Sequence, residues 1–156
     1  MRVEAKLDEL GLTLPEAPKL PPGVQLSFAW VRVHHDRAYV AGQGPLNPDG
    51  SIAEPLGKVG VDLTPEQGYE AARLSALTVL SSLKRELGDL DRVTAWLMVY
   101  GLVNADPDFT LTTNVINGFS DLILEVYGPD ARMAPGLATL PLGVPVTIAA
   151  EVAISG

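Results

Sequence analysis

The 156-residue chain has no cysteine and only two histidines. Without a thiol it can form no disulfide, no thiolate metal site and no cysteine nucleophile. His34 and His35 are adjacent, and neighbouring residues of a strand point to opposite faces, so the pair does not form a two-ligand metal site. We therefore expect no metal site.

Positive charge and long apolar runs are also scarce. The chain has 11 Lys and Arg against 19 Asp and Glu, a net charge of −8, which opposes binding to nucleic acid because phosphate contacts need many basic groups. No run approaches the roughly 18 apolar residues of a membrane-spanning helix, and the N-terminal residues lack the apolar stretch of a signal peptide. We expect a cytoplasmic protein with neither nucleic acid nor membrane as a partner.

The remaining basic residues are unevenly distributed, and Arg132 is the only Lys or Arg after Arg92. Such an isolated arginine either pairs with a nearby carboxylate or binds the carboxylate or phosphate of a ligand. The structural alternatives are an ion pair with Asp130 or Glu125, or a place just beyond the C-terminal end of a helix, where the helix dipole favours a cation. The residues alone leave these alternatives open.

Apolar residues, by contrast, are plentiful. Hydrophobic residues make up 47% of the chain and charged residues 19%. A chain of this length forms one domain, and a monomer of this composition would leave much apolar surface exposed. We expect a homo-oligomer.

Local patterns predict the order of helices and strands. Thr64, Pro65 and Gln67 form a capping box with proline at the first position of a helix, and Gly88 ends that helix. The other predicted elements are a leading helix that ends at Gly11, a hairpin of strands at 28–33 and 38–41, a strand at 93–103, a helix at 109–127, and closing strands at 133–140 and 144–154. We divide the chain into an N-terminal helix and extended connector, residues 1–23, and a main domain, residues 24–156.

The main domain therefore has the order ββ, α, β, α, ββ. This order is typical of an α+β sandwich, a mixed sheet with two helices on one face. The other face of the sheet is also rich in apolar residues, and no third layer is left within the chain to cover it. Packing of these faces in an oligomer is the simplest solution.

Three segments in register resemble the RidA (YjgF) family, also labelled the L-PSP endoribonuclease family. They are YVAGQGPLNPDG at 39–50, GDLDRV at 88–93, and Ala131–Arg132 followed by ATLPLGV at 138–144. The similarity runs from about residue 24 to the C-terminus. The leading helix and GKVGVDLT at 57–64 resemble a longer-chain branch of the family.

The resemblance implies a chorismate-mutase-like fold that assembles as a homotrimer, with the sheets forming an inner barrel and clefts between subunits. It implies hydrolysis of reactive enamines and imines, such as 2-aminoacrylate, to 2-keto acids and ammonia, without metal or organic cofactor. The ligand would be a small carboxylate or imino acid.

By this resemblance Arg132 is the anchor for the substrate carboxylate. The family's acidic residue, which transfers a proton to the leaving nitrogen, aligns with Thr147, and threonine is no general base near neutral pH. Glu151 shares its face of the strand but lies four residues, about 13 Å, farther along. This departure weighs against catalysis.

Further candidates for the cleft come from four places in the chain. Phe28 falls where the family often has a tyrosine, and Gln43 follows a strand between two glycines. An asparagine of the second helix also matches, with Asn117 preferred over Asn114. Finally, the main-chain groups of Ala134 and Gly136 flank Pro135, which marks a sheet edge or a bulge.

Two functions remain in competition. The first is an imine or enamine hydrolase, and the second is a non-catalytic protein that binds a small carboxylate in the same clefts. Ribonuclease activity is disfavoured because the chain lacks a positive groove and a convergent histidine and acid. Chorismate mutase activity would require more than one cation around its dicarboxylate.

Overall fold

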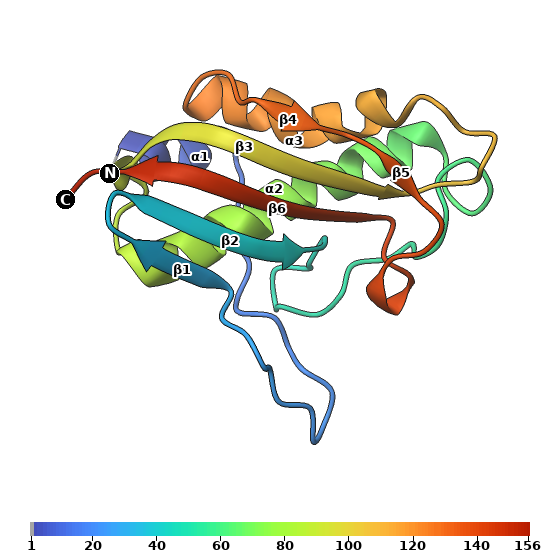
Figure 1. The fold of residues 1–156 in the computed structure, drawn as a ribbon, viewed down its shortest axis with the longest axis horizontal. Helices are drawn as coiled ribbons and strands as arrows, with labels where there is room; N and C mark the ends of the chain where they lie inside the picture. The colour runs from blue at the N-terminus through green and yellow to red at the C-terminus, as the bar shows by residue number, and fades with distance from the viewer. Residues whose placement is uncertain (1) are drawn as a thin grey trace.

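The computed structural model describes residues 2–156, which form a mixed sheet covered on one side by helices (Figure 1). The helices are α1 (Arg2–Glu9), α2 (Pro65–Leu87) and α3 (Thr112–Val126), with short 3₁₀ turns η1 (Leu90–Arg92) and η2 (Pro141–Gly143). The strands are β1 (Val31–His34), β2 (Arg37–Gln43), β3 (Val93–Asn104), β4 (Arg132–Met133), β5 (Gly136–Leu137) and β6 (Val146–Ile154).

The sheet has the order β1-β2-β6-β3-β4, and β5 pairs with β3 beyond β4. The first four strands are antiparallel to their neighbours, whereas β4 and β5 run parallel to β3. Both α2 and α3 lie behind the sheet, on the same face (Figure 1). The predicted α+β layers, with a mixed sheet and two helices on one face, are confirmed.

Helix α2 begins and ends where the sequence predicts. The Thr64 side chain accepts a hydrogen bond from the Gln67 amide, and the Gln67 side chain accepts one from the Thr64 amide, which completes the capping box. At the other end Gly88 has φ of +83°, a conformation that favours glycine, and its amide bonds to the Lys84 carbonyl.

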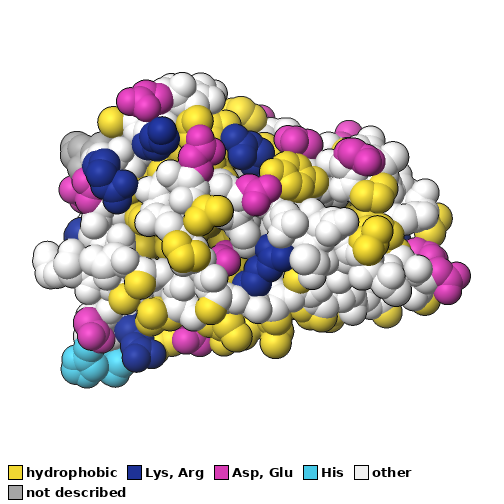
Figure 2. All heavy atoms as spheres, turned by 90° about the horizontal axis from the view of Figure 1, so that it is seen from above, with side chains coloured by type: hydrophobic (Ala, Val, Ile, Leu, Met, Phe, Trp, Pro, Cys, Tyr) yellow, Lys and Arg dark blue, Asp and Glu magenta, His cyan; other side chains and the backbone are white. Residues whose placement is uncertain are grey.

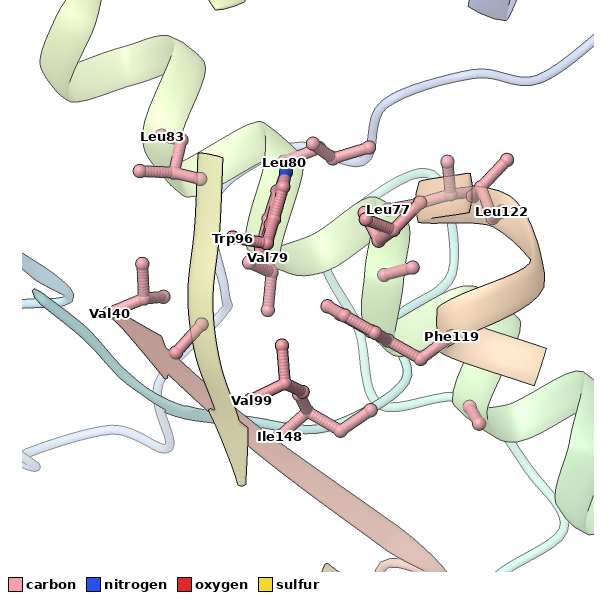
Figure 3. Packing of buried hydrophobic residues seen from close by; sticks show 14 of the residues in the cluster. Val40, Leu77, Val79, Leu80, Leu83, Trp96, Val99, Phe119, Leu122 and Ile148 are labelled. Atoms are coloured by element: carbon pink, nitrogen blue, oxygen red, sulfur yellow. The ribbon is translucent and has the colours of Figure 1, made fainter. Parts of the chain in front are cut away.

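The core fills the space between the sheet and the two long helices (Figure 3). Trp96 and Val99 of β3 project toward Phe119 of α3 and Leu80 of α2, and Phe119 and Leu80 are completely buried. The Trp96 and Phe119 rings meet edge to face, 5.7 Å between centroids. This core fixes α3 against the sheet and so determines where the polar face of α3 lies.

Helix α1 joins the same core, since Val3 and Leu7 are buried in it. Its first amides, of Arg2 and Val3, donate to the carboxylate of Asp91. In residues 2–156 no helix combines the length and the apolarity that crossing a bilayer requires.

Three predicted boundaries need correction. Helix α3 begins at Thr112 instead of 109, because a turn from Asp106 to Phe109 precedes it. Strand β1 begins at Val31 instead of 28. The strand predicted at 133–140 consists of two short pieces separated by Ala134 and Pro135, and both pair with β3.

The face of the sheet opposite the helices is uncovered in this chain. It carries a row of side chains that are exposed or half-buried, and residues that face each other across paired strands lie side by side in it. We call it the open face; its members include Arg32, Tyr39, Met98, Tyr100, Leu102, Met133, Thr147 and Glu151.

Candidate functional site

Arg132 lies on the edge strand β4 and reaches onto α3. Its Nη1 donates to Ser120 Oγ at 2.8 Å, and its Nη2 donates to Asn117 Oδ1 at 2.8 Å and to the Thr113 carbonyl at 3.2 Å. Ser120 in turn donates to Asp130 Oδ2 at 2.8 Å. We call these five residues, Thr113, Asn117, Ser120, Asp130 and Arg132, the Arg132 cluster.

The contacts of Arg132 differ from both structural alternatives. In residues 2–156 Arg132 makes no ion pair, and Asp130 reaches it through the Ser120 hydroxyl. The arginine also lies beside the first half of α3, next to Thr113, instead of beyond the C-terminal end of the helix. The helix dipole therefore does not account for its position.

The structure distinguishes the two asparagines of α3. Asn117 contacts Arg132, whereas Asn114 is exposed and lies at a shallow depression with Pro65 and Tyr69 of α2. Of the two, Asn117 alone belongs to the Arg132 cluster.

Ala134 and Gly136 follow Arg132 along the outer edge of β3. The carbonyls of Ala131 and Pro135 accept hydrogen bonds from β3 amides. Along a strand, the main-chain groups of successive residues point alternately toward and away from the neighbouring strand. Main-chain groups of Ala134 and Gly136 consequently point away from β3, toward the edge of the sheet. As the sequence suggests, Pro135 lies at this edge.

Thr147 does not face the same side of the sheet as Arg132. It pairs with Leu102 on the open face, whereas Arg132 pairs with the buried Val99 and points toward α3. Thr147 packs against Gly42, where a Cβ would lie 2.8 Å from Thr147 Cγ2. Within one chain, therefore, Arg132 and Thr147 do not converge on one ligand.

Glu151 also lies on the open face and accepts a hydrogen bond from the Tyr100 hydroxyl at 3.1 Å. This bond raises the pKa of Tyr100. The register irregularities near Glu151 place extra residues in β2 and β3, while β6 continues without interruption. Glu151 accordingly stays about 13 Å from Thr147 along the strand.

Gln43 does not line an open surface. Its side chain is 3% exposed, and its Oε1 accepts a hydrogen bond from Ser82 of α2 at 2.6 Å. Arg85 donates to Ser82 at 2.9 Å and to Ser81 at 2.7 Å, and Ser81 donates to the Pro15 carbonyl. These residues, Pro15, Gln43, Ser81, Ser82 and Arg85, form the Arg85 cluster, which ties the connector and β2 to α2.

Phe28 lies before β1 and is 55% exposed, with its ring edge against Trp30. Strand β1 forms one end of the sheet and β4 the other, four strand spacings or about 19 Å apart. A small ligand bound at Arg132 therefore cannot touch Phe28 of the same chain. A cleft with both residues requires a second copy.

One member of the Arg132 cluster, Ser120, carries a sequence signal that the predictions did not use. Ser120 stands three residues after Asn117 on α3, a spacing that puts both side chains on one face of a helix. Asp130 is a predicted direct partner of Arg132, and the structure instead places the Ser120 hydroxyl between them. For Thr113, whose carbonyl is the contact, the sequence has no signal.

One group of carboxylates in residues 2–156 has spacing that suits a metal ion, namely Glu4, Asp89 and Asp91. Its oxygens accept hydrogen bonds from the amides of Arg2, Val3 and Leu90, which joins α1 to η1. The group is thus part of the scaffold.

Comparison with known proteins agrees with the fold and with its layout. The family model described as "YjgF/chorismate mutase-like, putative endoribonuclease" matches residues 6–150. Protein TCP17 of Trypanosoma cruzi is 39% identical over 158 residues, which cover 99% of this chain and 95% of that protein.

Solved structures show the same arrangement. The protein Atu1372 of Agrobacterium tumefaciens, described as of unknown function, is 35% identical with a TM-score of 0.86, covering 98% of this chain and 92% of that one. A putative endoribonuclease from Shewanella oneidensis is 26% identical with a TM-score of 0.87, covering 97% and 99%. TdcF of E. coli, solved with bound serine, shares the fold at 17% identity and a TM-score of 0.61, covering 90% and 99%.

These matches confirm the predicted chorismate-mutase-like, RidA-like sandwich. The family model spans almost the whole sheet and all of α2 and α3, and the similarity to TCP17 extends over nearly every residue. The chain belongs to the RidA (YjgF) family, the YjgF/chorismate mutase-like proteins.

Proposed function

We propose that the protein hydrolyses small imines and enamines of 2-keto acids in a cleft between copies of the chain, without a cofactor. The observation that carries the proposal is the Arg132 guanidinium, which polar groups of α3 hold in place and which no carboxylate of residues 2–156 neutralises by direct contact. A planar guanidinium suits a carboxylate, and its charge-assisted hydrogen bonds strengthen in a partly dry cleft.

The reaction needs little beyond orientation. Water adds to the imine carbon, a proton moves to the nitrogen, and the C–N bond breaks as the carbonyl forms, which releases a 2-keto acid and ammonia. Arg132 holds the substrate carboxylate in this scheme, with Asn117 beside it. The main-chain groups of Ala134 and Gly136, which point away from β3, orient the reacting end.

A second copy supplies the rest of the cleft. The 19 Å between the ends of the sheet keeps Phe28 away from Arg132 of its own chain. The apolar open face is suited to association, and a homotrimer is the assembly that the family resemblance implies. A serine molecule bound to TdcF, a protein of this fold, supports a small amino or keto acid as the ligand.

A non-catalytic binding function is the second candidate, and Thr147 is the observation that favours it. By the family resemblance Thr147 aligns with the acidic residue, and the nearest carboxylate along β6, Glu151, accepts a hydrogen bond from Tyr100. Ribonuclease action has less support. Figure 2 shows Lys and Arg side chains that are separate and interspersed with Asp and Glu on the face it presents, instead of a continuous basic surface.

The deciding experiment is to generate 2-iminopropionate in solution and follow its loss with wild type, Arg132→Ala and, as matched control, Arg85→Ala. We expect hydrolysis faster than in buffer for wild type and Arg85→Ala, and a loss of tenfold or more in Arg132→Ala, as roughly expected for charged hydrogen bonds. Turnover no faster than in buffer, with 2-keto acids still bound in calorimetry, would leave the binding function. Equal ligand affinity of wild type and Arg132→Ala would refute the anchor.

A further inference from the structure

Ser120 stands between two opposite charges, Arg132 and Asp130. Its Oγ lies 2.8 Å from Arg132 Nη1 and 2.8 Å from Asp130 Oδ2. A guanidinium can only donate hydrogen bonds and a carboxylate can only accept them, so the directions are fixed. The Ser120 hydroxyl accepts a hydrogen bond from Arg132 and donates one to Asp130.

From this arrangement we infer that Ser120 and Asp130 are positioning residues, which fix the guanidinium of Arg132 for its ligand. The inference rests on the proposed function to the extent that Arg132 binds a carboxylate. It adds to that function the two residues that hold the anchor in place.

The chain of hydrogen bonds from Arg132 through Ser120 to Asp130, which we call the relay, differs from a direct ion pair in how many Arg132 N–H groups it leaves free for a ligand. A bidentate pair with Asp130 would occupy two donors of Arg132 and neutralise its charge. Three hydrogen bonds of the cluster start from a group with five N–H donors, so at least two N–H groups remain for a ligand. The carboxylate of Asp130 orients the Ser120 hydroxyl without touching Arg132. It therefore does not compete with an anion for the guanidinium.

Two separate elements hold the relay. Thr113, Asn117 and Ser120 succeed one another at four and three residues along α3, on one face of the helix. After α3 the chain reverses at Gly128, which has φ of +128°, and brings residues 130–132 back beside the helix. Figure 1 shows β4 running next to α3, and the Val99 amide fixes β4 to the sheet through the Ala131 carbonyl at 2.8 Å.

An ordinary helical serine would behave differently. In mid-helix the hydroxyl usually bonds to the carbonyl four residues earlier or points to solvent. Ser120 instead contacts two charged side chains that lie outside the helix, ten and twelve residues further along the chain.

The first test measures binding of 2-oxobutanoate by calorimetry. We expect Ser120→Ala to lower the affinity about fivefold to tenfold, because one hydrogen bond to a charged group is lost, and Ser120→Thr to retain most of it because the hydroxyl remains. Ser82→Ala is the matched control, since Ser82 makes the same kind of contact to Arg85. We expect it to leave the affinity unchanged. An equal loss of affinity in Ser120→Ala and Ser82→Ala, or no rescue by Ser120→Thr, would overturn the inference.

The second test needs no ligand. In NMR spectra the signals of the Arg132 guanidinium, identified by their loss in Arg132→Lys, should show slow rotation about Nε–Cζ in wild type. Rotation should be faster in Ser120→Ala and Asp130→Asn, while the Arg85 signals stay unchanged. The same rotation rate in all variants would refute positioning even if the ligand binds. Faster rotation in the variants, with no keto acid bound by wild type, would retain positioning and refute the proposed function.

Discussion

Within residues 2–156 two arginines donate to serine hydroxyls of a helix, and we propose an anion ligand for one of them, Arg132. Arg85 donates to Ser81 and Ser82 of α2, and Arg132 donates to Ser120 of α3. Neither makes an ion pair with a carboxylate in the part of the chain that the structure describes. The chemistry of the first contacts is therefore almost the same.

The two clusters differ in what lies beyond the serines. Ser81 and Ser82 donate onward to the Pro15 carbonyl and to Gln43, so the Arg85 cluster joins three segments that are far apart in the sequence. Ser120 donates to Asp130, which is only two residues before Arg132, so this link is local. Loss of Arg85 should weaken the fold without affecting ligand binding, and loss of Arg132 should act mainly on ligand binding.

The clusters also differ in their electrostatic setting. Arg85 lies in the last turn of α2, where the helix dipole stabilises a cation and disfavours an anionic ligand, and partial burial lowers the pKa of its guanidinium. Arg132 lies alongside α3 from Thr113 to Ser120 and next to main-chain groups of the sheet edge that point away from β3. The same side chain is a structural link in one setting and a candidate ligand anchor in the other.

The largest expected effect comes from Gly118→Ala, which disturbs the scaffold of the Arg132 cluster. A Cβ at Gly118 would lie 2.0 Å from the Tyr69 carbonyl oxygen of α2, so α3 would have to move away. We expect a loss of about 3 kcal/mol in the free energy of unfolding, or a melting temperature lower by roughly 6–12 °C. Thermal denaturation measures this, and an unchanged melting temperature would contradict the close helix contact.

Next in size is the reciprocal pair Arg132→Ala and Arg85→Ala. We expect Arg132→Ala to reduce 2-keto acid affinity about tenfold to a hundredfold, because its bonds to the ligand are lost. Its three bonds to α3 are partly exposed and can be replaced by water, so the free energy of unfolding should fall by no more than about 1 kcal/mol. Arg85→Ala should lower the free energy of unfolding by about 1 kcal/mol and leave the affinity unchanged. Calorimetry and urea denaturation of both variants check this, and the distinction between the clusters fails if both variants show the same pattern.

A smaller effect is expected from Gln43→Met, which tests whether Gln43 belongs to the interior. Gln43 Nε2 is buried without a partner in residues 2–156, so removing it offsets the loss of the bond that Ser82 donates to Gln43 Oε1. The free energy of unfolding should change by less than about 1 kcal/mol, and keto-acid affinity should stay the same. A clear loss of keto-acid affinity would instead indicate that Gln43 lines the ligand cleft.

The smallest effect is expected at Tyr69, whose hydroxyl donates to Asp121 of α3 at 2.8 Å. This bond raises the pKa of Tyr69 above its usual value of 10.0. The neutral hydroxyl therefore stabilises the fold fully below pH 10, and this contribution disappears as the pH rises through the raised pKa. Tyr69→Phe should lower the free energy of unfolding by less than about 1 kcal/mol at pH 7. Above the raised pKa of Tyr69 the variant and wild type should be equally stable, as measured by urea denaturation at a series of pH values. A difference independent of pH would refute this assignment.

Features of the fold that depend on neighbouring residues could be predicted from the sequence. The capping box at Thr64 and the glycine at 88 set both ends of α2, because the groups that satisfy the helix ends lie within three or four residues. Short runs rich in apolar, β-favouring residues predicted β2, β3 and β6 for the same reason. The predicted strand at 133–140 was wrong because its two short pieces pair with β3 residues that lie 33 positions earlier in the chain.

The candidate site divides in the same way. The scarcity of positive charge in the second half of the sequence indicated Arg132 as a candidate anchor, and the family resemblance favoured Asn117 over Asn114 as its neighbour. The direction of Gln43 toward α2 and of Thr147 toward the open face followed from strand register, which no local pattern fixed.

The sequence by itself determined an acidic chain without cysteine, the helices and strands with strong local signals, and the isolation of Arg132 in the second half. Only the tertiary structure decided that Ser120 separates Arg132 from Asp130 and that Phe28 lies at the opposite end of the sheet. The physical reason is distance along the chain. Caps and periodicity act within one or two turns, whereas the surroundings of a side chain depend on which distant strands pair and which helix packs over them.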